Sequence, residues 1–308
     1  MVRSHRTHVS GEWTARTAMT FTELLVSVTI VMALLGVVAP ALSGARQSAN
    51  AAVCVSNLRE LGTTTFLYTK DNDPVGKGGS HPVLPWHLGF DYPGASYSYA
   101  SEFIYGGFRT TVNHPDFPDS DVFVIPTEAR PFNKYLAPGR GGRSPLRPYI
   151  CPSDRSMATP LLGAGGAPPA METRYASWEA NGNSYAINWY WPFGVTDTYH
   201  NEYWDLPCMT LLGTAMLQAK VGGDASEFVL FMEGMMNAYV IDARPPDGSQ
   251  GQSQLQTLGD GWHAKYSMYC VGFYDGHAEY RFIDTRYTTG SGYDIWPEPD
   301  TRWPAGCP

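Results

Sequence analysis

The stretch Ala18-Met19-Thr20-Phe21-Thr22-Glu23-Leu24-Leu25, with the apolar run that follows it, decides how the rest of this chain is interpreted. The run from Leu24 to Ala45 reads LLVSVTIVMALLGVVAPALSGA, and its 22 residues carry no charge. A helix needs about 20 predominantly apolar residues to cross a bilayer core of about 30 Å. The run is therefore long enough to span a membrane, and no later stretch of the chain is comparable.

A single acidic residue, Glu23, stands at the start of this run. A carboxylate at the membrane boundary is costly unless it is paired, so we expect it to have a partner or a function. In a secretory signal peptide the apolar core is shorter and the small cleavage residues follow it. Here the small residue, Ala18, precedes the run. Cleavage after Ala18 would leave Met19 as the new N-terminus and the apolar helix still attached.

This arrangement resembles the class III signal of type IV pilins and type II secretion pseudopilins. The family pattern is a short basic leader, a small residue before the cut, Phe or Met, Thr, two apolar residues, Glu and a long apolar helix. Ala18 takes the place of the usual Gly, while Met19, Thr20 and Glu23 fit the pattern. Pro40 falls where many pilins carry a helix-loosening proline.

Two positions depart from that pattern, Ala18 in place of Gly and the polar Thr22 in place of an aliphatic residue. The alternative interpretation of the stretch is an ordinary single-pass anchor. The resemblance implies that a prepilin peptidase removes residues 1–18 and methylates Met19. It also implies that Glu23 pairs with the N-terminal amine of a neighbouring subunit during assembly.

The leader, residues 1–18, is net basic, with Arg3, Arg6 and Arg16 against Glu12. Positive charge beside a first apolar helix keeps that side of the membrane cytoplasmic. We therefore expect a single-pass inner-membrane protein whose C-terminal domain is periplasmic or at the cell surface.

The composition favours an exported, loop-rich domain that contains strands. Charged residues make up only 16% of the chain, while Gly (32), Pro (24) and Tyr (19) are abundant. The net charge of −8 argues against a nucleic-acid partner, because proteins that bind nucleic acids present basic patches. None of the five cysteines lies in a CxxC pair, which disfavours a zinc ribbon or a thioredoxin-like site.

The helical pattern continues beyond Pro40 to near Lys70. Small and apolar residues recur at three- and four-residue spacing, at Ala45, Ala49, Ala52, Val53, Leu58, Leu61, Leu67 and Tyr68. A helix of about 45 residues would be roughly 70 Å long. Because its own small domain cannot cover both halves, the N-terminal half needs lipid or neighbouring copies of the chain.

We expect an α+β fold in which a long, pilin-like N-terminal helix packs on a small antiparallel sheet domain with long loops. The expected divisions are a leader (1–18), a transmembrane or filament-core helix (19–45), its continuation (46–70), an exported α+β domain (71–285) and a flexible tail (286–308). A short helix is expected at 205–222. Expected strands are 184–193, 227–233, 237–241, 268–273 and 278–283. Asp275-Gly276 predicts a hairpin with a type I′ turn.

Four short elements sharpen the resemblance, towards a bacterial pseudopilin-like subfamily. They are CVSNLRELG at 54–62 followed by YTKDND at 68–73, YICPSD at 149–154 with Asp154, SYAIN at 184–188 with Asn188, and a His followed by Asp-Gly. In the subfamily nine residues separate that His from Asp-Gly, whereas eleven separate His263 from Asp275-Gly276. Because Cys54 and Cys151 both lie inside these elements, we expect a disulfide between them. Cys208 with Cys270 is the candidate second pair.

Other candidate sites have structural explanations that are as good. Asp71 and Asp73 offer oxygen ligands for Ca²⁺, but they lack the spacing of an EF-hand loop and fit a turn that ends the helix. His263, Asp275 and His277 suggest a metal or acid–base site without a third identifiable ligand. No G-x-S-x-G element supports a hydrolase. We therefore expect no cofactor and no enzymatic activity.

The sequence thus predicts a pseudopilin-like structural subunit of a type II secretion or type IV pilus-like machine. Its partners would be the membrane, a prepilin peptidase and other pilin-like subunits. The alternative is a binding module that keeps the pilin signal for anchoring and holds a carbohydrate or protein ligand. An anchored enzyme is a third class.

Overall fold

The computed structural model describes residues 19–71, 101–112, 121–142, 144–155, 175–188, 223–240, 258–263 and 265–295. The chain forms two compact units, Met1–Arg46 and Gln47–Pro308. The division falls inside the first helix, next to the boundary expected at residue 45.

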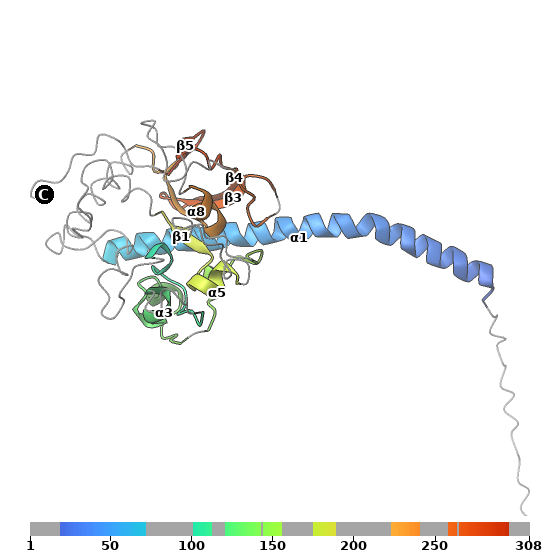
Figure 1. Cartoon of the computed structure of the whole chain (residues 1–308), viewed down its shortest axis with the longest axis horizontal. Coiled ribbons are helices and arrows are strands. Elements are labelled where there is room, and N and C mark those ends of the chain that lie inside the picture. Colours follow the sequence, from blue (N-terminus) through green and yellow to red (C-terminus); the bar gives the residue numbers. More distant parts are fainter. Residues whose placement is uncertain are drawn as a thin grey trace, which may run out of the picture. The chain divides into compact units, whose positions relative to one another are not determined.

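The first helix, α1, runs from Phe21 to Asp71 and contains 51 residues (Figure 1). It confirms the expected long helix and ends one residue beyond Lys70. At its start the Thr20 N–H donates to Glu23 Oε2 at 2.8 Å, and the Glu23 N–H donates to Thr20 Oγ1 at 3.3 Å. This reciprocal pair is a capping box, which satisfies two of the free donors of the first turn. The helix continues through Pro40, although the proline lacks the N–H that would bond to the carbonyl of Gly36.

In the first unit, the side chains of α1 are exposed on all sides, and they are mainly apolar as far as Ala45. The hydroxyls of Ser27 and Thr29 are bonded inside the helix. Ser27 Oγ donates to the carbonyl of Glu23 and Thr29 Oγ1 to that of Leu25, both at 2.7 Å. Within the described ranges, α1 is the one helix long and apolar enough to cross a membrane, by length and composition.

In the second unit, residues 47–71 of α1 bury one face. The buried residues are Ala51, Cys54, Leu58, Leu61, Gly62, Thr64 and Thr65. Their three- and four-residue spacing is that of an amphipathic helix. The expected face is correct at Leu58 and Leu61. It is wrong at Ala45, Ala49, Ala52, Val53 and Leu67, which are exposed. Alanines occur on several sides of this helix, so their spacing alone selects no face.

The domain contains a four-stranded antiparallel sheet in the order β1-β2-β3-β4, which confirms the α+β fold. Its strands are β1 (Tyr185–Ile187), β2 (Val229–Glu233), β3 (Met268–Phe273) and β4 (Ala278–Phe282). In β1 and β3 the apolar side chains divide between two clusters, because successive residues of a strand point to opposite faces, whereas in β2 a register shift puts both Leu230 and Phe231 in one cluster. Cys270 joins the cluster that contains Leu58 of α1, and Val271 joins the other.

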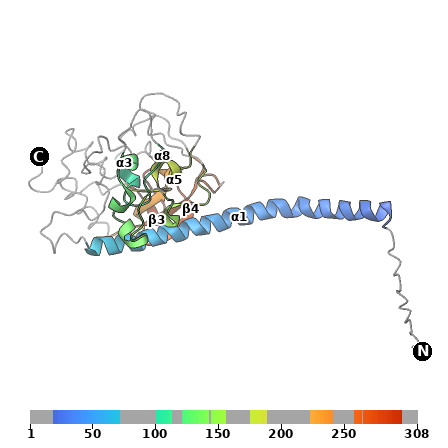
Figure 2. The ribbon, with the colours of Figure 1, turned by 90° about the horizontal axis from the view of Figure 1, so that it is seen from below.

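Contacts with α1 fix this face of the sheet. Arg59 Nη2 donates to the carbonyl of Ala278 at 3.2 Å, and a Cβ placed on Gly272 would lie 3.5 Å from Leu58 Cβ. Figure 2 shows the same part of α1 running past β3 and β4. The central strands β2 and β3 are therefore covered on both faces, which explains their almost uninterrupted apolar sequence.

The hairpin between β3 and β4 is present, but its turn differs from the expected type I′. Gly276 has φ of +90°, and Asp275 is not among the residues with positive φ. The Gly276 N–H donates to the Phe273 carbonyl at 3.0 Å, and the Phe273 N–H donates to the His277 carbonyl at 2.8 Å. This is a three-residue loop with a left-handed glycine. Asp275 Oδ1 accepts the His277 N–H at 3.0 Å, which suits an ordinary right-handed Asp275.

The prediction of a strand at 237–241 is wrong, because Gly234–Val240 forms the helix α8. Met236 and Val240, four residues apart, are both buried in the second apolar cluster, which is helical spacing. A short apolar run such as this one fits either a strand or a helix until its neighbours are known.

The prediction of a flexible tail from residue 286 is also wrong for residues 286–295. Strands β5 (Thr289–Gly290) and β6 (Tyr293–Asp294) pair, and Ile295 is fully buried. The Asp294 N–H donates to the Glu227 carbonyl at 2.7 Å, which fastens this segment beside β2. Residues 296–308 and the helix expected at 205–222 lie outside the described residues.

Short helices complete the domain and position the loops around the sheet. They are η2 (Ser101–Phe103), α3 (Asp121–Val124), η3 (Thr127–Ala129), α4 (Asn133–Leu136), η4 (Arg147–Tyr149) and α5 (Ser177–Asn181).

Candidate functional site

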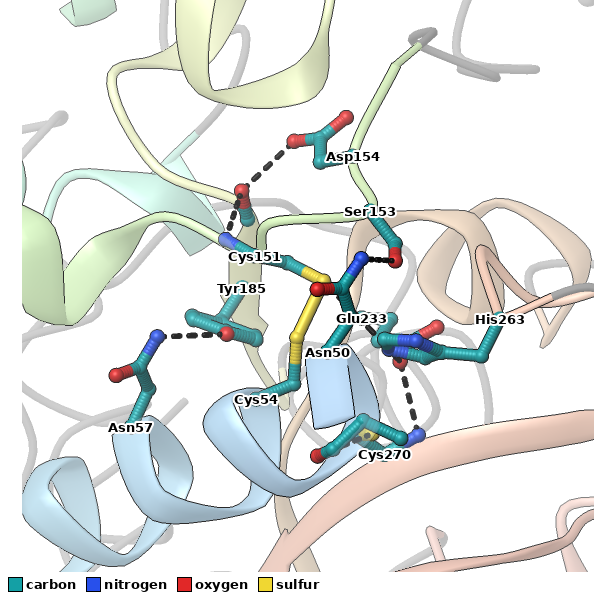
Figure 3. Close-up of polar contacts among 12 residues, drawn as sticks. Asn50, Cys54, Asn57, Cys151, Ser153, Asp154, Tyr185, Glu233, His263 and Cys270 are labelled. Atoms are coloured by element: carbon teal, nitrogen blue, oxygen red, sulfur yellow. Dashed lines mark hydrogen bonds and ion pairs between the residues drawn. A yellow bond between two sulfur atoms is a disulfide. The ribbon is translucent and has the colours of Figure 1, made fainter. Parts of the chain in front are cut away.

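The sequence elements meet where α1 crosses the sheet, around a disulfide between Cys54 and Cys151 (Figure 3). This confirms the expected pair, which closes a sequence separation of 97 residues. Both cysteines are buried. We call the surrounding residues the junction cluster: Asn50, Cys54, Asn57, Cys151, Ser153, Asp154, Ser184 and Tyr185.

Two asparagines of α1 bind the domain on either side of the disulfide. Asn50 Nδ2 donates to Ser153 Oγ at 3.0 Å. Asn57 Nδ2 lies within hydrogen-bond distance of the Ile150 carbonyl, at 3.0 Å, and of the Tyr185 hydroxyl, at 3.1 Å. One helix face therefore contacts both the segment around Cys151 and the strand β1.

Asp154 holds the start of helix α5. Its Oδ1 accepts the Ser177 N–H at 2.9 Å, and its Oδ2 accepts the Trp178 N–H at 3.1 Å. Ser184 Oγ donates to Oδ2 at 2.7 Å and accepts the Cys151 N–H at 3.0 Å. Burial raises the pKa of Asp154 to about 7, and the hydrogen bond from Ser184 is the largest opposing effect. The geometry gives Asp154 a structural role.

Asn188 also has a structural role. Its Nδ2 donates to the carbonyls of Val229 at 2.8 Å and Ile295 at 2.9 Å. The side chain thereby joins the end of β1, the start of β2 and the residue after β6. It is fully buried.

His263 and Asp275-Gly276 do not form one site. His263 is buried, whereas Asp275 lies on the hairpin and contacts His277, with Oδ1 and Nδ1 2.5 Å apart. Gly276 instead meets α1, because a Cβ on Gly62 would lie 2.9 Å from Gly276 Cα. The Asp-Gly element is explained by the turn and by this close approach.

His263 belongs to a group that the sequence did not reveal, the buried triad Glu233, His263 and Cys270 (Figure 3). His263 Nε2 lies 3.2 Å from Glu233 Oε1, and the Cys270 N–H donates to the same oxygen at 3.0 Å. All three side chains are at most 1% exposed. The available signal was Glu233 itself, a carboxylate that ends an otherwise apolar strand.

Cys270 is a free thiol, so the candidate pair Cys208–Cys270 is wrong; Cys208 lies outside the described residues. The Sγ of Cys270 lies 3.8 Å from the carbonyl oxygen of Ala51. Burial, together with the nearby Glu233 carboxylate, raises the pKa of the Cys270 thiol well above its ordinary value. A buried thiol with a raised pKa is a poor nucleophile, unless a bound cation lowers that pKa so that the thiolate forms.

The calcium candidates give no oxygen cluster in the part of the chain that the structure describes. Asp71 Oδ2 accepts from Lys134 Nζ at 2.8 Å and from the Tyr135 hydroxyl at 2.7 Å, which joins the end of α1 to α4. Asp73 lies outside the described residues, as does Ala18 at the expected cleavage position. Met19 is exposed and lies two residues before the start of α1.

Comparisons of the chain with models of protein families, with curated proteins and with solved structures give no match. The fold itself therefore defines the architecture. A long apolar N-terminal helix whose second part packs on a small antiparallel sheet is a pilin-like architecture.

Proposed function

We propose that this protein is a pseudopilin-like structural subunit of a type II secretion or type IV pilus-like machine, anchored in the inner membrane and assembled through the first part of α1. The observation that carries the proposal is the apolar surface of residues 21–45. Its large side chains, from Phe21 to Leu42, are each about half exposed or more within the chain. A continuous apolar surface of this kind marks contact with lipid or with another protein.

The hydrogen bonding of α1 supports an apolar environment. In a bilayer or a dry filament core, polar groups must be satisfied inside the segment. The Ser27 and Thr29 hydroxyls meet this condition, since each donates to the carbonyl four residues earlier.

The hydrogen bonds of Glu23 support the proposed contact with a neighbouring subunit, because Glu23 caps its own helix through only one of its two carboxylate oxygens. Thr20 donates to Glu23 Oε2 through both N–H and Oγ1, each at 2.8 Å. No bond from a described residue to Oε1 is present, so this oxygen can receive a neighbour's N-terminal amine. A carboxylate fixed at the first turn would set the axial register between neighbouring helices.

The disulfide supports an exported domain. Structural disulfides form and persist in oxidising compartments such as the periplasm and the cell surface. The buried Cys54–Cys151 bond lies in the second unit, and the basic leader predicts that this part lies outside the cytoplasm.

Mass spectrometry of the mature N-terminus tests this route first. The full chain would be expressed with and without a prepilin peptidase and purified from membranes. We expect a chain that begins at N-methyl-Met19 only when the peptidase is present. A chain that keeps residues 1–18, or one cut behind the apolar run, would contradict the proposal.

Assembly is tested separately by cysteine-independent cross-linking of the processed protein in membranes. Glu23→Gln removes the charge at the start of α1, and we expect loss of cross-linked oligomers with unchanged membrane retention. Glu60→Gln is the matched control, since it alters an exposed glutamate of the same helix in the second unit. Equal oligomer yields for both variants would exclude a role of Glu23 in assembly.

A further inference from the structure

We propose that Glu233, His263 and Cys270 bind a divalent transition-metal ion, for which Zn²⁺ is the best fit. The ion would join the two central strands to the loop that precedes β3. This site is unrelated to the apolar surface of α1, and it does not depend on the proposed assembly role.

The three side chains offer a suitable set of donor atoms. Each provides one candidate ligand atom, and these atoms all lie within 4.8 Å of one another. Carboxylate oxygen, imidazole nitrogen and thiolate sulfur are the three donor types that zinc uses in proteins. Ca²⁺ and Mg²⁺ prefer sets made only of oxygen, so they fit this site poorly.

The distance between the histidine nitrogen and the carboxylate oxygen also fits a zinc site. His263 Nε2 and Glu233 Oε1 are 3.2 Å apart. In a tetrahedral zinc site with bonds of about 2.0–2.2 Å, two such ligands are separated by about 3.3–3.6 Å. An ion could therefore enter between them with only a small outward shift of either side chain.

The central strands of the sheet hold two of the ligands. Glu233 is the last residue of β2, and Cys270 lies in the middle of β3. The backbone N–H of Cys270 already donates to Glu233 Oε1, which orients the carboxylate (Figure 3). His263 lies between these strands in sequence and packs edge-on against Tyr280, with ring centroids 5.4 Å apart.

An unmet polar atom of the triad points to a missing partner. Glu233 Oε2 is buried and has no hydrogen-bond partner among the described residues. A buried carboxylate is costly unless it is paired and fully hydrogen-bonded. A metal ion would supply a positive counter-charge for the Glu233 carboxylate.

Charge balance favours an ion of charge +2. Binding would displace the Cys270 thiol proton to solvent and leave a thiolate, as metal binding to cysteine requires. With a neutral imidazole, one carboxylate and one thiolate neutralise a divalent cation. The buried site would then carry no net charge.

The disulfide limits which sulfur can take part. Cys151 Sγ lies 3.6 Å from His263 Nε2, and Cys54, Cys151 and His263 form a second close group of candidate ligands. While Cys54 and Cys151 are joined, neither has a thiolate to offer. The proposed site therefore uses Cys270 and leaves the disulfide intact.

Co²⁺ provides a spectroscopic probe for this site. The full chain in detergent would be unfolded and refolded without reductant in the presence of Co²⁺, because the site is closed to solvent in the folded protein. We expect one bound Co²⁺ per chain, a thiolate-to-cobalt charge-transfer band, and displacement of that band by Zn²⁺. Refolded wild-type protein that retains its disulfide but binds no Co²⁺ would overturn the proposal.

Variants separate the two sulfur sources. Cys270→Ala should abolish the charge-transfer band, whereas Cys54→Ala with Cys151→Ala should retain it. A band that survives Cys270→Ala, or that disappears from the folded double variant, would place the metal on another cysteine and overturn the proposed triad.

A stability readout keeps the test valid if a variant folds poorly. A ligand that binds only the folded state raises the thermal midpoint. Zn²⁺ should therefore raise the midpoint of the wild-type chain relative to chelator. It should have no effect on Glu233→Gln, which keeps an oxygen acceptor for the Cys270 N–H. Equal midpoints of the wild-type chain with Zn²⁺ and with chelator would assign the triad to a buried ion pair alone.

Discussion

The two parts of α1 belong to one continuous helix, yet they use their side chains in opposite ways. In residues 21–46 every side chain is exposed, and the surface is mainly apolar. In residues 47–71 a single face is buried, and it carries the cysteine of the disulfide. Continuous helical structure therefore says little about function here. The distribution of apolar and polar residues around the helix decides whether a part of it serves the domain or an outside partner.

The same difference appears in the polar residues. In the second part, Asn50, Asn57 and Arg59 each donate to groups of the domain far away in sequence. In the first part, Ser27 and Thr29 bond only within the helix. Changes in the second part should therefore alter domain stability, and changes in the first part should alter anchoring and assembly.

The largest effect on this comparison is expected from removing the disulfide. Cys54→Ala with Cys151→Ala frees a loop that spans 97 residues, and the free energy of unfolding of the domain should fall by about 2–4 kcal/mol. Urea denaturation in detergent, followed by tryptophan fluorescence, measures this loss. Reductant should produce the same loss in the wild-type chain and no further loss in the double variant. An unchanged midpoint would mean that the hydrogen bonds of the junction cluster hold α1 without the disulfide.

A smaller effect is expected from pH, and it should come from the second unit. Burial raises the pKa of Glu102 to about 8, and that of Asp154 to about 7. Because the folded state holds these protons more tightly than the unfolded state, stability is greatest below the ordinary carboxyl pKa. It should fall as the pH rises towards 8 and stay level above that value. Between pH 5 and pH 8 we expect a loss of about 1–3 kcal/mol, which is less than about 1.4 kcal/mol for each tenfold difference in proton affinity would give, because the site can relax and admit water around a charged carboxylate.

Glu102→Gln tests the origin of that pH dependence. The amide oxygen can still accept from Asn237 Nδ2, which lies 3.3 Å from Glu102 Oε1. The variant should therefore fold, and its stability should depend less on pH than that of the wild-type chain in urea titrations at pH 5, 6.5 and 8. Glu128→Gln, at an exposed position, should leave the wild-type profile unchanged. A profile as steep as wild type in Glu102→Gln would exclude this carboxyl as the cause.

Local patterns predicted the long helix and strands β2 and β3 from apolar runs of the right length, and strand β4 from the Asp-Gly turn that precedes it. They failed at 237–241, where a short apolar run packs as the helix α8. They also failed at 286–295, where a Gly-rich composition suggests a loose tail but the buried Ile295 fastens the segment to the core. In both segments the deciding contacts come from residues far away in sequence.

The same limit applies to the sites. The sequence identified Cys54, Asp154 and Asn188 as members of motifs, and one motif-based pairing, Cys54 with Cys151, is confirmed. It did not identify the groups that Asp154 and Asn188 bind, because these are separated by up to 107 residues. The triad was missed because Glu233 and Cys270 lie in different strands, and only the pairing of β2 with β3 brings them together.

Two glycines of α1 provide the smallest and most direct test of the comparison. A Cβ on Gly62 would lie 2.9 Å from Gly276 Cα and 3.1 Å from its carbonyl oxygen, whereas a Cβ on Gly44 meets nothing within 4 Å. The hairpin cannot easily move aside, since Gly276 holds a left-handed conformation and itself packs against Phe66. Overpacking costs about 1–3 kcal/mol, and the helix propensity of alanine returns up to about 1 kcal/mol.

Gly62→Ala should therefore lower the free energy of unfolding of the domain by about 1 kcal/mol, measured by urea denaturation in detergent. Gly44→Ala introduces the same methyl group into the same helix, but in the first unit, so the domain should unfold at the wild-type midpoint. If both variants behaved alike, the division of α1 at residue 46 would have no energetic meaning. A loss confined to Gly62→Ala would show that the helix is bound to its domain only where the sequence motifs lie.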